Sequence, residues 1–157
     1  SDTTNIRVFG SLTFVPGFQQ HYLGRFSFES TGTGNEITSA GHPFLNDIIF
    51  NGEGGGWKLL DELTCDEGVY LNKGTLQTNN KSLNCVDFHS ETQFVRSLML
   101  SASTINVDSW SVDGTGLSMQ AMSATFYIVK SMLNANGGPL HYPDIRFLGL
   151  SANLVNE

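Results

Sequence analysis

Charged side chains are scarce in this chain. Only 15% of its 157 residues are Asp, Glu, Lys or Arg, against roughly 25% in an average soluble domain. There are 8 Lys and Arg against 15 Asp and Glu, which leaves a formal net charge of −7 at pH 7. A protein that binds a phosphate backbone needs a basic surface to displace the counterions. Nucleic acid is therefore excluded as an expected partner.

Long apolar runs and catalytic motifs are missing as well. No run approaches the ~18 residues of a membrane-spanning helix, so no membrane insertion is expected. The chain contains no GxSxG nucleophile elbow, no P-loop and no HExxH zinc motif. Its two cysteines, Cys65 and Cys85, are too few for a disulfide scaffold and form no CxxC pair. No catalytic residue is assigned from these patterns.

The chain consists instead of short alternating segments separated by turns rich in Gly and Asn. Segments such as 47–50, 69–71 and 104–107 alternate apolar and polar residues, as half-buried strands do. Clusters such as 30–35 and 51–56 supply the residues that tolerate a positive φ. Strands and turns that recur every ~8–12 residues predict an all-β fold.

The segment 118–136 is the ambiguous part of this pattern. Its Met, Gln, Ala and Lys residues favour a helix, and the following Gly-Gly-Pro at 137–139 is typical of a helix end. Its centre, 125–129, is β-branched and aromatic, which favours a strand. We therefore expect a strand and keep the helix as the alternative.

A short sequence period indicates how the strands are arranged. Similar apolar-polar pairs recur about every 20–22 residues, at 37–38, 63–64, 83–84 and 105–106. A period of this size is typical of stacked coils in a β-solenoid, where Leu63, Leu83 and Ile105 would form one interior ladder. At ~21 residues a coil, the chain would hold about seven coils. A β-sandwich or jelly roll is the alternative, because its strands recur at a similar spacing.

A longer repeat links residues 47–52 to residues 144–149. Both segments read Asp-Ile-x-Phe-x-Gly and lie 97 residues apart. The repeat divides the chain into units of about 26–122 and 123–157, of which the second is incomplete. We therefore expect a single β-solenoid domain over 1–157 that is a segment of a longer repeat array, with flanking domains in the same chain.

These segments also resemble a known type of protein. The strings Ser-Thr-Gly-Thr-Gly-Asn at 30–35, Asp-Ile-Ile-Phe-Asn-Gly at 47–52, Gly-Gly-Trp at 55–57 and Gly-Thr-Leu at 74–76 resemble the repeat units of large bacterial cell-surface and adhesin-like proteins. The resemblance implies a right-handed parallel β-helix that is secreted or exposed at the cell surface. It also implies a noncatalytic role as a stalk or adhesive binding face, with glycans or other surface proteins as partners. A carbohydrate-binding or polysaccharide-cleaving all-β domain is the alternative function.

Three carboxylates are the candidate metal ligands. Asp66, Asp87 and Asp108 are each 21 residues apart, so regular coils would stack them in one column. Carboxylates at ~5 Å steps repel each other unless a cation offsets their charge, and Ca²⁺ prefers such oxygen ligands. The sequence therefore predicts a calcium site here and no other cofactor. Three solvated turn residues are the alternative interpretation, and polysaccharide-cleaving acids are a further one.

Aromatic side chains are the candidate ligand-binding residues. Sugar rings stack on exposed aromatic faces, and we select Trp57, Trp110 and Tyr70 for this role, with Tyr127 and Tyr142 qualifying by residue type. The alternative is that these rings belong to the core.

The two cysteines occupy equivalent places, since Cys65 follows Leu63-Thr64 and Cys85 follows Leu83-Asn84. If the two strands are parallel neighbours, their separation of about 4.8 Å suits a disulfide. A buried, reduced pair is the alternative.

Overall fold

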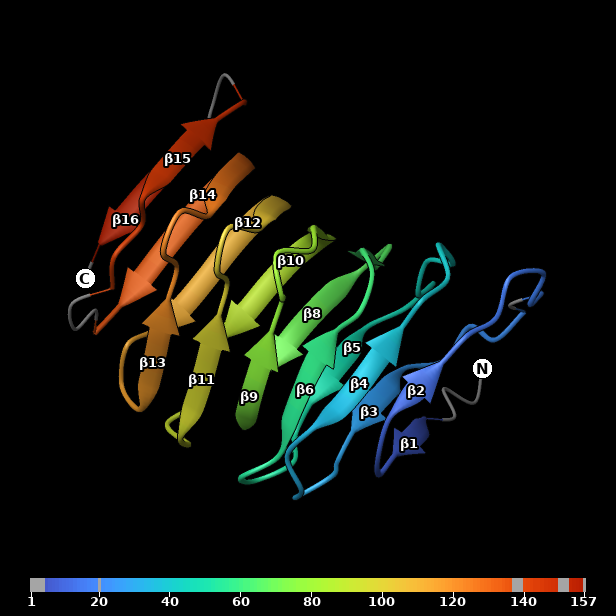
Figure 1. The fold of residues 1–157 in the computed structure, drawn as a ribbon. Coiled ribbons are helices and arrows are strands. Elements are labelled where there is room, and N and C mark those ends of the chain that lie inside the picture. Colours follow the sequence, from blue (N-terminus) through green and yellow to red (C-terminus); the bar gives the residue numbers. More distant parts are fainter. Residues whose placement is uncertain (1–4, 20, 137–139, 150–152, 157) are drawn as a thin grey trace.

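The chain is wound into a parallel β-solenoid of about seven turns (Figure 1). The computed structural model describes residues 5–19, 21–136, 140–149 and 153–156. Two sheets face each other across a shared core. Sheet A consists of β1 (Ile6–Val8), β3 (Phe26–Phe28), β5 (Ile48–Phe50), β7 (Leu63–Thr64), β8 (Gly68–Leu71), β10 (Leu83–Ser90), β12 (Thr104–Asp113), β14 (Thr125–Ala135), β15 (Asp144–Phe147) and β16 (Asn153–Asn156). Sheet B consists of β2 (Leu12–Thr13), β4 (Asn35–Thr38), β6 (Gly56–Leu59), β9 (Gly74–Gln77), β11 (Arg96–Met99) and β13 (Leu117–Gln120).

The strand pairing confirms the solenoid. Sheet A runs in the order β1-β3-β5-β8-β10-β12-β14-β15, with β7 added to β10 and β16 to β14, and sheet B runs β13-β11-β9-β6-β4-β2. Every strand pair among the described residues is parallel. A sandwich or jelly roll would need antiparallel neighbours, so that alternative is wrong. The helix alternative for 118–136 is also wrong, because this segment contains the end of β13 and all of β14.

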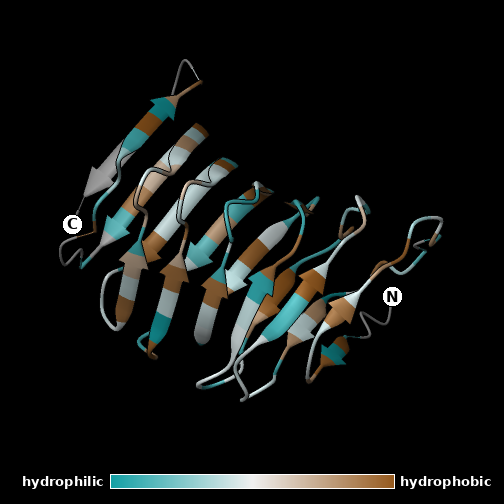
Figure 2. Cartoon of the chain, viewed as in Figure 1, coloured by the Kyte–Doolittle hydropathy of each residue, from teal (hydrophilic) through white to brown (hydrophobic). Residues whose placement is uncertain are grey.

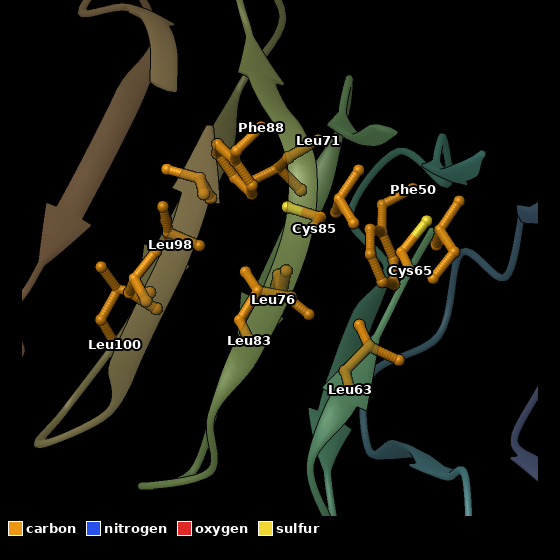
Figure 3. Packing of buried hydrophobic residues seen from close by; sticks show 14 of the residues in the cluster. Phe50, Leu63, Cys65, Leu71, Leu76, Leu83, Cys85, Phe88, Leu98 and Leu100 are labelled. Carbon is orange, nitrogen blue, oxygen red and sulfur yellow. The ribbon is translucent and has the colours of Figure 1, made fainter. Parts of the chain in front are cut away.

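The expected interior ladder is present. Leu63 pairs with Leu83, and Leu83 pairs with Ile105. All three side chains are buried between the sheets, and Figure 3 shows the two leucines beside the buried side chains around them. Ile37 lies in sheet B and belongs to a different ladder, although it shares the short sequence period.

The longer repeat does not correspond to a repeated position in the coil. Ile48 pairs with Val69, whereas its counterpart Ile145 pairs with Phe126. Both copies of the repeat lie in sheet A, but their ladders run along different parts of each coil. The reason is that paired residues in sheet A lie 19 to 22 positions apart, so 97 residues are not a whole number of coils.

Side-chain alternation separates the core from the surface. Successive residues of a strand point to opposite faces, so each strand contributes one apolar set to the interior and one mostly polar set to the outside (Figure 2). One continuous cluster of buried apolar residues runs between the two sheets. The outward residues of sheet A are therefore displayed as rows that cross the coils, and these rows form the surface considered next.

The turn glycines provide a matched test of this packing. Gly74 and Gly34 both have positive φ, +79° and +82°. A Cβ on Gly74 would lie 2.6 Å from the carbonyl oxygens of Gly52 and Gly55, whereas a Cβ on Gly34 would meet nothing within 4 Å. We expect Gly34→Ala to lower the free energy of unfolding by roughly 1–2 kcal/mol, the cost of the left-handed conformation. Gly74→Ala should lower it by clearly more in urea titrations. Equal losses would show that the turn absorbs the extra methyl group.

Candidate functional site: a groove on the outer face of sheet A

A groove of about 490 Å³ crosses the outer face of sheet A, perpendicular to the strands. One side is a row of polar side chains, Thr64, Asn84, Asn106 and Tyr127, which pair in register across β7, β10, β12 and β14. The other side lies two residues further along the chain and consists of Asp66, Val86, Asp108, Val129 and Leu148. The backbone of Cys65, Cys85 and Val107 lies between the two rows, because residues i and i+2 share a face of a strand.

Hydrogen bonds between coils hold the polar row in place. The Asn106 amide donates to Oδ1 of Asn84 at 2.7 Å, and the Asn84 amide donates to the Thr64 hydroxyl at 3.2 Å. Arg146 extends the row, because it pairs with Tyr127 in register, donates to the Tyr127 hydroxyl at 3.2 Å and lies 5.4 Å from the ring centroid. The row therefore presents preorganised amide and hydroxyl groups followed by an aromatic ring.

The second row combines carboxylates with apolar groups. Asp108 forms an ion pair of 2.7 Å with Lys130, and its hydrogen bond and charge raise the pKa of Lys130. The β12–β14 register shifts between Val107 and Ser109, as in a β-bulge. Asp66 is exposed, and Val129 and Leu148 present apolar surface at the far end of the groove.

The predicted column of three aspartates is wrong in its register. Asp87 pairs with Gly68 and Ser109, not with Asp66 and Asp108. Unequal coil lengths cause this shift. Asp66 and Asp108 do line the same groove, but Val86 stands between them. Within the part of the chain that the structure describes, no group of three or more His, Cys, Asp or Glu side chains is placed to hold a metal ion. Calcium binding stays a prediction.

Two of the three predicted aromatic platforms are part of the core. Trp57 and Trp110 are both 0% exposed, so neither presents a ring face to a ligand in solvent. Trp110 stacks on Phe88 with 4.3 Å between ring centroids, and its indole N–H donates to the Tyr142 hydroxyl at 3.1 Å. Burial raises the pKa of Tyr142 to about 12. The selection of both tryptophans is therefore wrong, because strand alternation points them inward.

Tyr70 points outward from β8 and remains a candidate. Its ring stacks on His89 with 4.9 Å between centroids, so one face is already covered. The His89 Nδ1 atom lies 2.9 Å from a Glu91 carboxylate oxygen, and Ser111 donates to the other oxygen at 2.6 Å. Burial opposes ionisation of Glu91, but these two hydrogen bonds outweigh it and lower its pKa. Burial, followed by the charges of two nearby aspartates, raises the pKa of Tyr70.

Residue-type reasoning missed the polar row. Thr64, Asn84 and Asn106 are the second members of the apolar-polar pairs that reveal the short period, so the signal was present in the sequence. Their importance follows only from the register, which places them side by side on the outer face. Tyr127 qualified by type, and the structure places it at the end of this row.

The two cysteines lie in adjacent coils, as their spacing predicts. Thr64 pairs with Asn84, and the amide of Cys65 donates to the Asn84 carbonyl at 2.9 Å, so Cys65 and Cys85 are neighbours in consecutive coils. Both are buried and free in this structure, and Figure 3 shows them in the core beside Leu71 and Phe50. Burial raises the pKa of the Cys65 thiol to about 12 and raises that of Cys85 as well.

No protein-family model matches the chain, and no curated protein or solved structure matches it either. Among the described residues, no helix is long and apolar enough to span a membrane.

The buried thiols predict a pH effect on stability. Unfolded thiols titrate near pH 8.5, whereas the folded pKa of Cys65 is about 12. The folded state therefore keeps protons that the unfolded state releases, so the stabilisation is complete below about pH 8.5 and is lost as the pH rises towards 12. The free energy of unfolding should fall over this range, and it should fall less in a Cys65→Ala/Cys85→Ala variant.

A thiol reagent provides the accompanying measurement. We expect it to label neither cysteine in the folded protein and both after unfolding in urea without reductant. Failure to label either thiol in urea would instead identify a disulfide between them.

Proposed function

We propose that this chain is a noncatalytic, adhesive and structural module of a secreted or cell-surface bacterial protein, and that it binds an extended glycan in the groove of sheet A. The observation that carries the proposal is the continuous row from Thr64 through Asn84 and Asn106 to Tyr127 along one side of that groove. The location and the bacterial origin rest on the resemblance of the sequence to surface-protein repeats.

The chemistry of the groove suits a carbohydrate chain. Amide and hydroxyl groups can exchange hydrogen bonds with sugar hydroxyls, and they recur at the strand spacing of about 4.8 Å along the row. The Tyr127 ring and the apolar Val129 and Leu148 side chains suit the C–H faces of sugar rings. Because the groove runs across several coils, it favours an extended ligand over a compact one.

The charge of the groove narrows the choice of glycan. Its lining contains two carboxylates, Asp66 and Asp108, and no lysine or arginine. Only Asp108 has a cationic partner in the ion pairs found among the described residues. A polymer of uronic acids would be repelled. We therefore expect neutral or amino-sugar polymers to bind more tightly than acidic ones.

The stalk role is consistent with the construction of the solenoid. Each coil contacts mainly its neighbours, and parallel backbone pairing joins successive coils along the length of the chain. A stack of this type holds its outward rows at fixed spacings, so the same architecture supports both a spacer and a repetitive binding face.

The binding proposal is tested by screening glycans and then measuring affinity. For a neutral or amino-sugar polymer that binds the wild-type protein, Asn106→Ala and Tyr127→Ala should each raise the Kd by about tenfold, the loss of one hydrogen bond or one stacking contact. Ser118→Ala, on the exposed outer face of sheet B, is the matched control and should leave the Kd unchanged.

Two results would contradict the proposal. Equal affinities for wild-type protein and both groove variants would place the ligand elsewhere. Release of new sugar ends during incubation would favour the polysaccharide-cleaving alternative, with Asp66 and Asp108 as the acids to replace by Asn.

The calcium prediction has its own test. If Ca²⁺ binds between Asp66 and Asp108, the melting temperature should rise with excess Ca²⁺ and fall with chelator, since a ligand of the folded state stabilises it. Asp66→Asn should abolish this difference, whereas Asp87→Asn should not, because Asp87 pairs with Gly68 and Ser109 outside the groove. A melting temperature that is the same in Ca²⁺ and in chelator would remove calcium from the groove.

A further inference from the structure

A second cavity lies at the corner where sheet A turns into sheet B, and unequal turn lengths create it. The turn from β8 to β9 has only two residues, Asn72 and Lys73. In the coils on either side, the corresponding loops 51–55 and 91–95 have five residues each. These longer loops stand on both sides of the short turn and enclose about 400 Å³. Volumes of this size are typical of small-molecule sites.

The lining combines one aromatic wall with a polar rim. Phe94 and Gln93 come from one loop, and Glu53 comes from the other. Gly74, Thr75 and Ser97 form the floor. Thr75 and Ser97 pair in register on the outer side of sheet B, so their hydroxyls lie side by side. Phe94 is 51% exposed, which is unusual for a phenylalanine with no partner in the core.

Lys73 links the two walls and balances their charge. Its Nζ atom lies 4.0 Å from the Phe94 ring centroid and 3.7 Å from a Glu53 carboxylate oxygen. The ammonium group therefore offsets the only carboxylate of the lining. A site with this balance favours an uncharged ligand over an anion or a cation.

A buried arginine holds the aromatic wall in place. The Arg96 guanidinium is buried and donates to the Phe94 carbonyl at 3.1 Å, to the Thr92 hydroxyl at 3.2 Å and to the Asp113 carbonyl at 2.6 Å. These bonds tie loop 91–95 to the neighbouring coil. The ring is therefore positioned before any ligand arrives, which reduces the entropy cost of binding.

We infer that this corner cavity binds a single uncharged sugar ring of hexose size. The C–H face of the sugar would lie against the free surface of Phe94, and its hydroxyls would meet Gln93, Glu53, Thr75 and Ser97. The cavity lies apart from the groove of sheet A and shares no lining residue with it, so this inference stands or falls separately from the proposed function.

The test uses the whole chain and a panel of methyl hexosides, including glucoside, galactoside and mannoside. Isotope-labelled protein is titrated and amide shifts are followed by NMR. We expect at least one hexoside to bind in fast exchange and to shift the amides of residues 93–97. Phe94→Ala should weaken this binding about tenfold, the loss of one aromatic contact, and Phe94→Trp should retain it. Because Phe94 is exposed, neither change should disturb the fold.

Controls separate the corner cavity from the groove. Ser97→Ala removes a floor hydroxyl and should weaken hexoside binding, whereas Asn106→Ala in the groove should not. Absence of binding by every hexoside, or equal binding by Phe94→Ala, would overturn the inference. Binding of an aromatic amino-acid amide in place of the sugars would overturn it too, by identifying a peptide site.

Discussion

The parallel, in-register pairing of each coil with its neighbours is the constraint on which the rest of the structure depends. Backbone hydrogen bonds decide which residues lie side by side, and strand alternation then decides which of them face inward. The ladder of Leu63, Leu83 and Ile105 and the outer row of Thr64, Asn84 and Asn106 are consequences of the same pairing. A shift of one residue would exchange these two rows and expose the core.

This pairing also explains why the chain carries so little charge. Outward side chains in adjacent coils are only about 4.8 Å apart, so like charges stacked in a row would repel strongly. Amide and hydroxyl side chains avoid this cost and bond to each other, as Asn106 does to Asn84. The charges that remain are often paired with a residue of the next coil, as Arg25 is with Asp47 and Lys58 is with Glu36. The excess of Asn, Ser and Thr therefore follows from the architecture.

Irregular coil length is what distinguishes one part of the surface from another. The paired residues of sheet A lie 19 to 22 positions apart, and this variation moves Asp87 out of line with Asp66 and Asp108. It also leaves the two-residue turn at Asn72 and Lys73 between longer loops, which creates the corner cavity. A strictly periodic solenoid would display identical rows along its length. Small departures from the period instead produce two separate concave sites with different lining chemistry.

The sequence alone determined the all-β class, the stacked coils and the interior ladder, because local alternation and a period near 21 residues are properties of the chain itself. It also placed Cys65 and Cys85 in adjacent coils, where the structure holds them as buried, free thiols. Only the tertiary structure decided which aromatics face the core, so Trp57 and Trp110 were misassigned while Tyr127 gained a surface role. The same holds for the aspartates and for the 97-residue repeat, whose copies occupy different coil positions. The physical reason is that side-chain neighbours depend on cumulative register, which each irregular turn changes and no local pattern records.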